Sequence, residues 1–147
     1  ERLTLAVHLR NRGVGHAVPS GLPARRLVLE VRPVGTDEAA PPTARVELGR
    51  VLVDDSGQIS PFYSATKVAR DDRLGVDEHR EIPLALDLPA ASEVELRLSW
   101  LSYADEIAKH LEIAPATPVR VASLTLPADA TRASSEKPER QRESSPR

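Results

Sequence analysis

The sequence of 147 residues contains no cysteine and no methionine, and its only aromatic residues are one Phe, one Trp and two Tyr. Without cysteine, the chain has no thiol nucleophile, no disulfide bond, no zinc–thiolate site and no Cys-x-x-Cys-His segment for attaching c-type haem. So few aromatic rings argue against a stacking platform for single-stranded nucleic acid. The formal net charge of −2 argues against a basic surface for phosphate backbones. We therefore expect no nucleic-acid partner.

Long hydrophobic runs are also missing. No apolar run approaches the roughly twenty residues that a membrane-spanning helix needs, so we expect no membrane span. A length of 147 residues with 40% hydrophobic content fits one globular domain with a core of its own. The chain begins at Glu1, without an initiator Met or a leader, and we expect a processed protein or a piece of a longer one.

Motifs of the common enzyme classes are absent as well. There is no Gly-x-Ser-x-Gly elbow, phosphate-binding loop, His-Glu-x-x-His pair or dinucleotide-binding glycine pattern. Ser20 follows His16 by four residues, but no third residue is evident that would orient such a nucleophile–base pair. We predict that the chain is not an enzyme and carries no catalytic residue.

Apolar and polar residues alternate with a period of two along much of the chain, a pattern that predicts β-strands. The alternation is found in residues 3–9, 27–31, 43–53, 82–88 and 94–100, and a last strand is expected at about 118–126. Gly49 predicts a bulge or bend, residues 89–92 predict a hairpin connection, and Pro83 predicts an edge strand. Together these features predict an all-β fold, an antiparallel, immunoglobulin-like β-sandwich of about seven strands.

One short helix and a polar tail complete the expected organisation. Ser102 and Asp105 have the spacing of a helix cap, and Ile107 and Leu111 then lie on one face, which predicts a helix of about two turns over one end of the sandwich. Beyond Pro127 alanine is the only apolar residue type. We therefore predict a β-sandwich domain over residues 1–127 and a disordered polar tail over residues 128–147.

The segment 11–21 (NRGVGHAVPSG) has the composition of a shaped loop between two predicted strands. It contains three glycines, one proline and a single histidine, His16. Glycine permits unusual backbone angles and proline restricts the exit of the chain, so we expect a loop that holds the imidazole outward. Two interpretations remain open. His16 is either a ligand of a metal or cofactor, or its ring simply bonds a backbone carbonyl.

The other three histidines have structural explanations. His8 lies on the polar face of a predicted strand, and His79 lies within the charged stretch 77–81. His110 falls in the last turn of the predicted helix, where a cation is favoured by the helix dipole.

Two acidic pairs raise the question of a calcium site. The segment that starts at Asp54 (DDSG) lacks the further oxygen ligands of an EF-hand loop, and Asp and Gly are common turn residues. Asp71 and Asp72 are followed by an arginine, so we predict a loop held by ion pairs, with Arg25 or Arg26 as further partners. The sequence therefore predicts turns and ion pairs at these positions.

Several segments, taken in order, carry a resemblance. Residues 11–21 resemble the pattern Asn-x-x-Ala/Val-Gly-His-x-x-Pro-Thr/Ser-Gly, and residues 25–31 resemble the strand that follows it. Residues 50–57 are similar to a Leu-x-Asp-x-x-Gly turn, residues 65–74 to Ala-x-x-Val-x-x-Asp-x-Arg-Leu/Ile, and residues 98–103 to a strand leading to Tyr and a helix. These patterns are similar to those of the C-terminal, haem-free β-domain of bacterial multihaem c-type cytochromes of the cytochrome c-554-like group.

The resemblance implies an electron-transfer component: a haem-free β-sandwich domain or subunit that packs on a multihaem c-type cytochrome region. Haem c is then held by another segment or subunit, and the protein is exported to the periplasm or the cell exterior. Because imidazole is a common axial ligand of haem iron and the chain has no methionine, His16 is the candidate distal ligand. The alternative is a protein–protein interaction or adhesion-type β-sandwich module of an exported protein.

Overall fold

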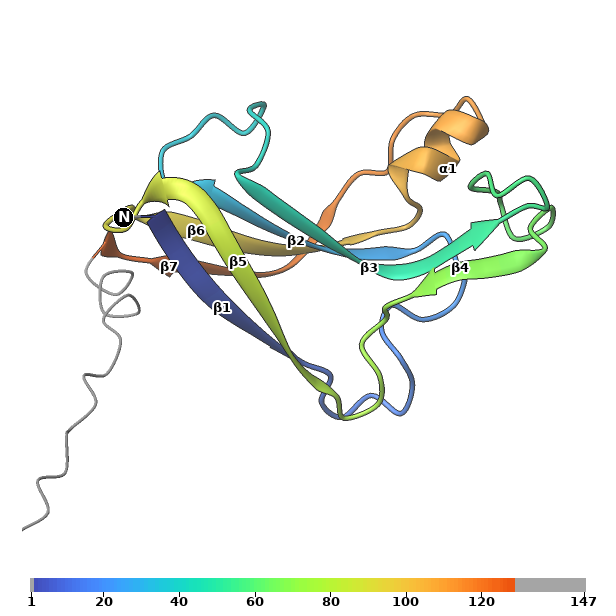
Figure 1. Cartoon of the computed structure of the whole chain (residues 1–147), viewed down its shortest axis with the longest axis horizontal. Helices are drawn as coiled ribbons and strands as arrows, with labels where there is room; N and C mark the ends of the chain where they lie inside the picture. The colour runs from blue at the N-terminus through green and yellow to red at the C-terminus, as the bar shows by residue number, and fades with distance from the viewer. Residues whose placement is uncertain (1, 129–147) are drawn as a thin grey trace, which may run out of the picture.

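The computed structural model describes residues 2–128, in which seven strands form two antiparallel sheets accompanied by the short helix α1 (Asp105–His110) (Figure 1). The strands are β1 (Arg2–Arg10), β2 (Arg26–Pro33), β3 (Ala44–Val53), β4 (Lys67–Asp71), β5 (His79–Pro89), β6 (Val94–Leu101) and β7 (Val119–Leu126). One sheet contains β1 and β5, and the other has the order β4-β3-β2-β6-β7. The predicted antiparallel β-sandwich is confirmed. Except for residue 128, the predicted tail lies outside the described residues.

The core lies between the two sheets. Successive side chains of a strand point to opposite faces, so one apolar set from each of β1, β2, β5 and β6 points inward. The most deeply buried members are Leu3, Val31, Leu86 and Val94, none of them more than 1% exposed. Burial of each such side chain contributes about 1.5–3 kcal/mol, which makes this interface the main source of stability.

Strand β2 is buried on both faces. It lies between β3 and β6 in the middle of the larger sheet, and its second face contributes Val28 to a smaller cluster with Leu101 and Ala116. Tyr103 packs against this cluster and donates a hydrogen bond from its hydroxyl to the carbonyl of Ala114 at 2.8 Å. The segment after β6 is thereby held against the outer face of the sheet.

The predicted hairpin at residues 89–92 is wrong. Strand β5 pairs with β1, whereas β6 pairs with β2 and β7, so this short connection crosses from one sheet to the other. Period-two alternation shows which side chains face inward but does not identify the neighbouring strand. The edge position predicted from Pro83 is confirmed, because β5 pairs only with β1 within the described residues.

The predicted break at Gly49 is also wrong. Strand β3 runs from Ala44 to Val53, and the irregularity in its pairing with β4 lies between Val51 and Leu52. A Cβ atom on Gly49 would lie 2.8 Å from the carbonyl oxygen of Arg25. Glycine is therefore required here by the close approach of the neighbouring strand.

Helix α1 has close to the predicted length of two turns, but it begins later than expected. Its N-cap residue is Ala104, which makes no side-chain cap, so the capping role predicted for Ser102 is wrong. Ala104 is fully buried and donates its backbone N–H to the carbonyl of Ala24 at 2.8 Å. Packing against the β1–β2 connection therefore sets the start of the helix. Within residues 2–128, no helix is long and apolar enough to cross a membrane.

Candidate functional site

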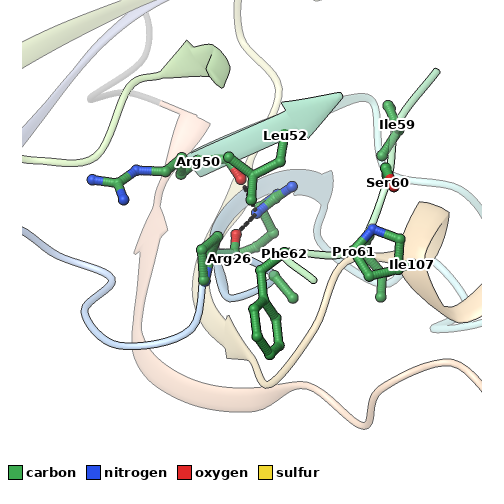
Figure 2. A pocket seen from close by; sticks show the side chains of 10 residues that line it. Arg26, Arg50, Leu52, Ile59, Ser60, Pro61, Phe62 and Ile107 are labelled. Carbon is green, nitrogen blue, oxygen red and sulfur yellow. Dashed lines mark hydrogen bonds between the residues drawn. The ribbon is translucent and has the colours of Figure 1, made fainter. Parts of the chain in front are cut away.

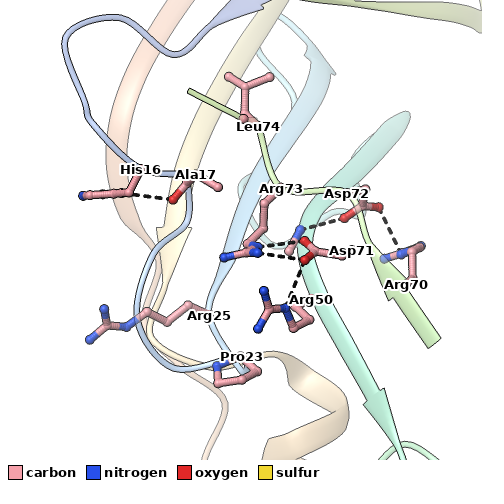
Figure 3. Close-up of polar contacts among 12 residues, drawn as sticks. His16, Ala17, Pro23, Arg25, Arg50, Arg70, Asp71, Asp72, Arg73 and Leu74 are labelled. Atoms are coloured by element: carbon pink, nitrogen blue, oxygen red, sulfur yellow. Dashed lines mark hydrogen bonds and ion pairs between the residues drawn. The ribbon is translucent and has the colours of Figure 1, made fainter. Parts of the chain in front are cut away.

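His16 lies on the loop between β1 and β2 and is exposed (Figure 3). Its Nδ1 lies 3.1 Å from the carbonyl oxygen of Ala17. A carbonyl only accepts hydrogen bonds, so in the neutral ring this contact places the proton on Nδ1 and leaves the lone pair on Nε2. Figure 3 shows the imidazole pointing away from the neighbouring Arg–Asp cluster. The ring thus makes the bond to a backbone carbonyl that the structural interpretation expects. In that tautomer its Nε2 keeps the lone pair that a ligand role requires.

Asn11 holds the base of this loop. It is only 4% exposed, and its Nδ2 donates to the carbonyl of His16 at 2.9 Å and to that of Gly75 at 2.8 Å. Its backbone N–H donates to the carbonyl of Glu78 at 3.0 Å. One buried amide therefore ties the histidine loop to a segment more than sixty residues further along the chain. The sequence motif begins with Asn11, but nothing in it indicated these distant partners.

A short backbone bridge fixes the other side of the loop. Val18 and Leu74 exchange two N–H···O hydrogen bonds, each 2.8 Å long, and Leu74 is buried. Two of the segments that carried the resemblance, residues 11–21 and 65–74, are thus direct neighbours. The backbone of the histidine loop is held at both sides, which limits the positions that the ring can take.

An Arg–Asp cluster lies beside the loop (Figure 3). The carboxylate of Asp71 accepts bonds from Arg73 at 2.7 Å and from Arg50 at 3.0 Å. These guanidinium groups, Arg73 first, hold the pKa of Asp71 well below its ordinary value. Asp72 pairs with Arg70 at 3.0 Å and accepts the backbone N–H of Gly49.

The predicted ion-pair loop is therefore confirmed, but the partners predicted for it, Arg25 and Arg26, are wrong. The register of β3 against β4 places Arg50 opposite Asp71, and this pairing supplies the partner.

Glu78 and Arg80 hold residues 72–75 in place through hydrogen bonds. Arg80 donates to the Glu78 carboxylate at 2.7 Å and to the backbone carbonyls of Asp72 and Arg73. Glu78 accepts the backbone N–H of Gly75 at 2.6 Å, and this bond, followed by the Arg80 guanidinium, lowers its pKa. Segment 72–75, on which the histidine loop rests, is therefore itself tied down by charge-assisted hydrogen bonds.

Arginine side chains without carboxylate partners flank the loop. Within residues 2–128, Arg10, Arg12 and Arg25 make no ion pair. Arg25 donates to the carbonyl of Ser20 at 2.9 Å and lies 5.6 Å from the centre of the Trp100 ring. The surroundings of His16 therefore present positive charge that is available to an anionic group.

The other candidate residues make no hydrogen bond to His16 within the described residues. His8 is exposed, as expected of a polar face, and its ring lies 5.2 Å from that of His79. His110 ends α1, as predicted. Among the described residues, no cluster of three or more His, Asp or Glu side chains is arranged to hold a metal ion. No hydrogen bond joins Ser20 to His16 in that part of the chain.

The predicted turn at Asp54 is confirmed. Its Oδ1 accepts the backbone N–H of Ser56 at 2.9 Å and of Gln58 at 3.0 Å, as well as the Ser56 hydroxyl. The Ser56 hydroxyl, followed by the Gln58 amide, lowers the pKa of Asp54. Asp54 thus serves as a turn residue whose carboxylate accepts the backbone N–H groups of the residues that follow it.

A small pocket near α1 encloses the buried guanidinium of Arg26 (Figure 2). Its Nη1 donates to the carbonyls of Pro23, Arg25 and Arg50 at 2.8–3.0 Å, and burial lowers its pKa. The pocket volume of about 10 Å³ leaves room for one water molecule at most. Arg26 therefore has a structural role, joining the β1–β2 connection to β3.

No protein-family model matches the sequence, and no curated protein matches it either. Among solved structures, the chain is similar to a penta-heme cytochrome c552 from Thermochromatium tepidum, with a TM-score of 0.67 and 24% sequence identity. The fold resembles part of a multihaem cytochrome. The similarity covers 86% of this chain and 36% of the cytochrome, so this chain spans only about a third of that protein's length. At this identity the likeness shows a shared fold and no more.

Proposed function

We propose that this chain is the haem-free β-sandwich component of an electron-transfer protein and packs on a multihaem c-type cytochrome region. The observation that carries the proposal is the fold shared with the penta-heme cytochrome c552, over most of this chain and a minor part of the other. The sequence contains no cysteine, so the thioether bonds of any c-type haem are made by another segment or subunit. Attachment of such haem outside the cytoplasm makes the periplasm or the cell exterior the proposed location.

His16 is proposed as the distal ligand of one haem of that region. The bond from its Nδ1 to the carbonyl of Ala17 leaves Nε2 able to coordinate, and the same bond fixes the ring tautomer. Asn11 and the bridge between Val18 and Leu74 hold the loop in place before any ligand arrives. If a haem of that region has a single protein ligand, the Nε2 of His16 would supply a second nitrogen ligand. The role of this chain is to present that nitrogen from a rigid loop.

Titration with a haem c undecapeptide, which has one histidine ligand and an open sixth position, tests the ligand role. We expect the Soret spectrum to convert to that of six-coordinate, low-spin haem with the wild-type chain and with His110→Ala. His16→Ala should abolish the conversion, because its Nε2 is then missing.

Conversion that persists in His16→Ala would show that the histidine has no ligand role. An equal, partial decrease of the conversion in His16→Ala and in His110→Ala would show unselective binding by exposed imidazoles and would also contradict the proposal. If haem neither coordinates nor binds, the interaction or adhesion-type module becomes the better account of the chain.

A further inference from the structure

An open apolar groove runs between β1 and β7. It consists of two hollows of about 160 and 230 Å³ that share Leu9 and Leu98. Side chains of β2 and β6 form its floor, Val7 and Leu9 of β1 form one wall, and Val121 and Leu124 of β7 form the other. We call this feature the β1–β7 groove.

The groove exists because the two sheets differ in width. Strands β1 and β5 cover β2 and β6, whereas β7 is the edge strand of the five-stranded sheet (Figure 1). Val121 and Leu124 are consequently 58% and 57% exposed. An edge strand with exposed apolar side chains is a ready site for association, and proteins ordinarily cover or blunt it. The β1–β7 groove is therefore a surface that favours a partner.

Two arginines lie at one end of the groove, whereas His8 and Ser123 are the polar residues that line the other hollow. Arg10, Asn11 and Arg12 line it there together with Val14 and Val18, which belong to the loop that carries His16. Within the described residues, the guanidinium groups of Arg10 and Arg12 make no ion pair. The β1–β7 groove thus combines an apolar surface with two arginines that have no carboxylate partner, and it adjoins the loop that carries His16.

We propose that the β1–β7 groove is the surface on which this chain receives the exposed edge of a haem c held by the partner polypeptide. This inference rests on the proposed function and assigns it a contact surface. A porphyrin edge is apolar and is flanked by propionate carboxylates, which matches an apolar trough ended by two arginines. The cytochrome with the similar fold has nearly two thirds of its length outside the matched part, so that its fold includes a further region against which a domain of this shape can pack.

Charge complementarity favours this occupant over a second copy of the chain. A copy joined edge to edge through β7 would cover the apolar side chains but would supply no carboxylates for Arg10 and Arg12 by that pairing alone. A haem edge provides both an apolar surface and anionic groups. The apolar residues of the groove and the two arginines therefore contact the same haem.

Trp100 offers a readout that does not depend on iron coordination. It is the only tryptophan of the chain and follows Leu98 on β6, so haem bound in the groove shortens its fluorescence lifetime. The probe is again the haem c undecapeptide. We expect the double variant V121E/L124E to weaken the binding at least about tenfold, because glutamates insert charge into the trough and repel the propionates.

Val68→Glu is the matched control. Val68 is 56% exposed on β4, at the opposite edge of the same sheet, and the variant should bind within about twofold of wild type. Arg12→Glu provides a second test at the polar end, with an expected loss of at least about fivefold. Arg12 is exposed, so this variant remains informative if the double variant does not fold.

The outcomes separate this inference from the proposed function. If the groove variants bind the undecapeptide as wild type does while His16-dependent low-spin conversion persists, the haem-binding role of the groove is wrong. The proposed function then stands. If the undecapeptide produces neither lifetime change nor spectral conversion, both fail. If the double variant instead abolishes self-association in sedimentation, or binding to anionic phosphatidylserine vesicles, without an effect on haem binding, the occupant is a second copy or a membrane and the inference is overturned.

Discussion

The side-chain amide of Asn11 donates a hydrogen bond to the backbone carbonyl of His16 at 2.9 Å. The same amide also reaches Gly75, so a single buried residue joins the histidine loop to the segment after β4. Because the bonded atoms are backbone carbonyls, no complementary side chain marks this relationship in the sequence. The position of His16 therefore depends on a residue five places before it and on a segment far along the chain.

Asn11→Ala should lower the free energy of unfolding by about 1–3 kcal/mol. The substitution removes a buried donor and leaves the carbonyls of His16 and Gly75 without it. Chemical denaturation measures the change. The neighbouring variant Arg12→Ala removes no hydrogen bond found within the described residues, and it should stay within about 0.5 kcal/mol of wild type. Equal stability of Asn11→Ala and wild type would contradict the structural role of the amide.

Arg26→Leu should cost at least about 2 kcal/mol. Arg26 is only 2% exposed, and its Nη1 bonds three carbonyls that leucine would leave without this donor. Arg2→Ala is the matched contrast, because Arg2 pairs with Asp87 on the surface and such pairs contribute about 0–1 kcal/mol. Urea denaturation of both variants compares them directly, and similar losses would contradict the role assigned to the buried guanidinium.

Gly49→Ala should destabilise the fold by about 1–3 kcal/mol, through overpacking against the backbone of Arg25. The control is Gly15→Ala, since no heavy atom outside the glycine and its two chain neighbours lies within 4 Å of the position of its Cβ. Thermal unfolding distinguishes the two variants. A tolerated Gly49→Ala would mean that β2 and β3 separate locally without cost.

Asp71 should make stability depend on pH in the acid range. Its pKa in the folded chain lies below the ordinary value of 3.8, so its contribution is complete above that value and is lost as the pH falls toward the folded pKa. Asp71→Asn removes this contribution and should flatten the acid limb of the stability curve. Urea denaturation between about pH 6 and about pH 2 tests this.

Asp55→Asn is the control for the acid-range measurement, because Asp55 is exposed and takes part in no ion pair within residues 2–128. It should retain the slope of wild type. An equal change in both variants would show that the effect comes from overall charge.

Much of the sandwich could be predicted because its cause is local. Inward residues such as Leu3, Leu5, Leu86 and Leu96 follow the strict alternation that a half-covered strand requires. The turn at Asp54 and the exposed loop around His16 likewise follow from residue types with known backbone preferences. The helix start was misjudged at Ser102 because the buried Ala104 sets it through packing.

Residue types and their alternation alone specify six of the seven strands of the described residues, all but β4, together with the inward faces of the main strands and the residues of the histidine loop. The lack of cysteine likewise means that this chain cannot anchor c-type haem covalently. Four features arise only from long-range contacts in the folded chain. They are the pairing of β5 with β1, the ion pair of Arg50 with Asp71, the bonds from Asn11 to His16 and Gly75, and the groove between β1 and β7. Alternation specifies which way a side chain faces, whereas strand partners and uncovered edges depend on contacts between residues far apart in the chain.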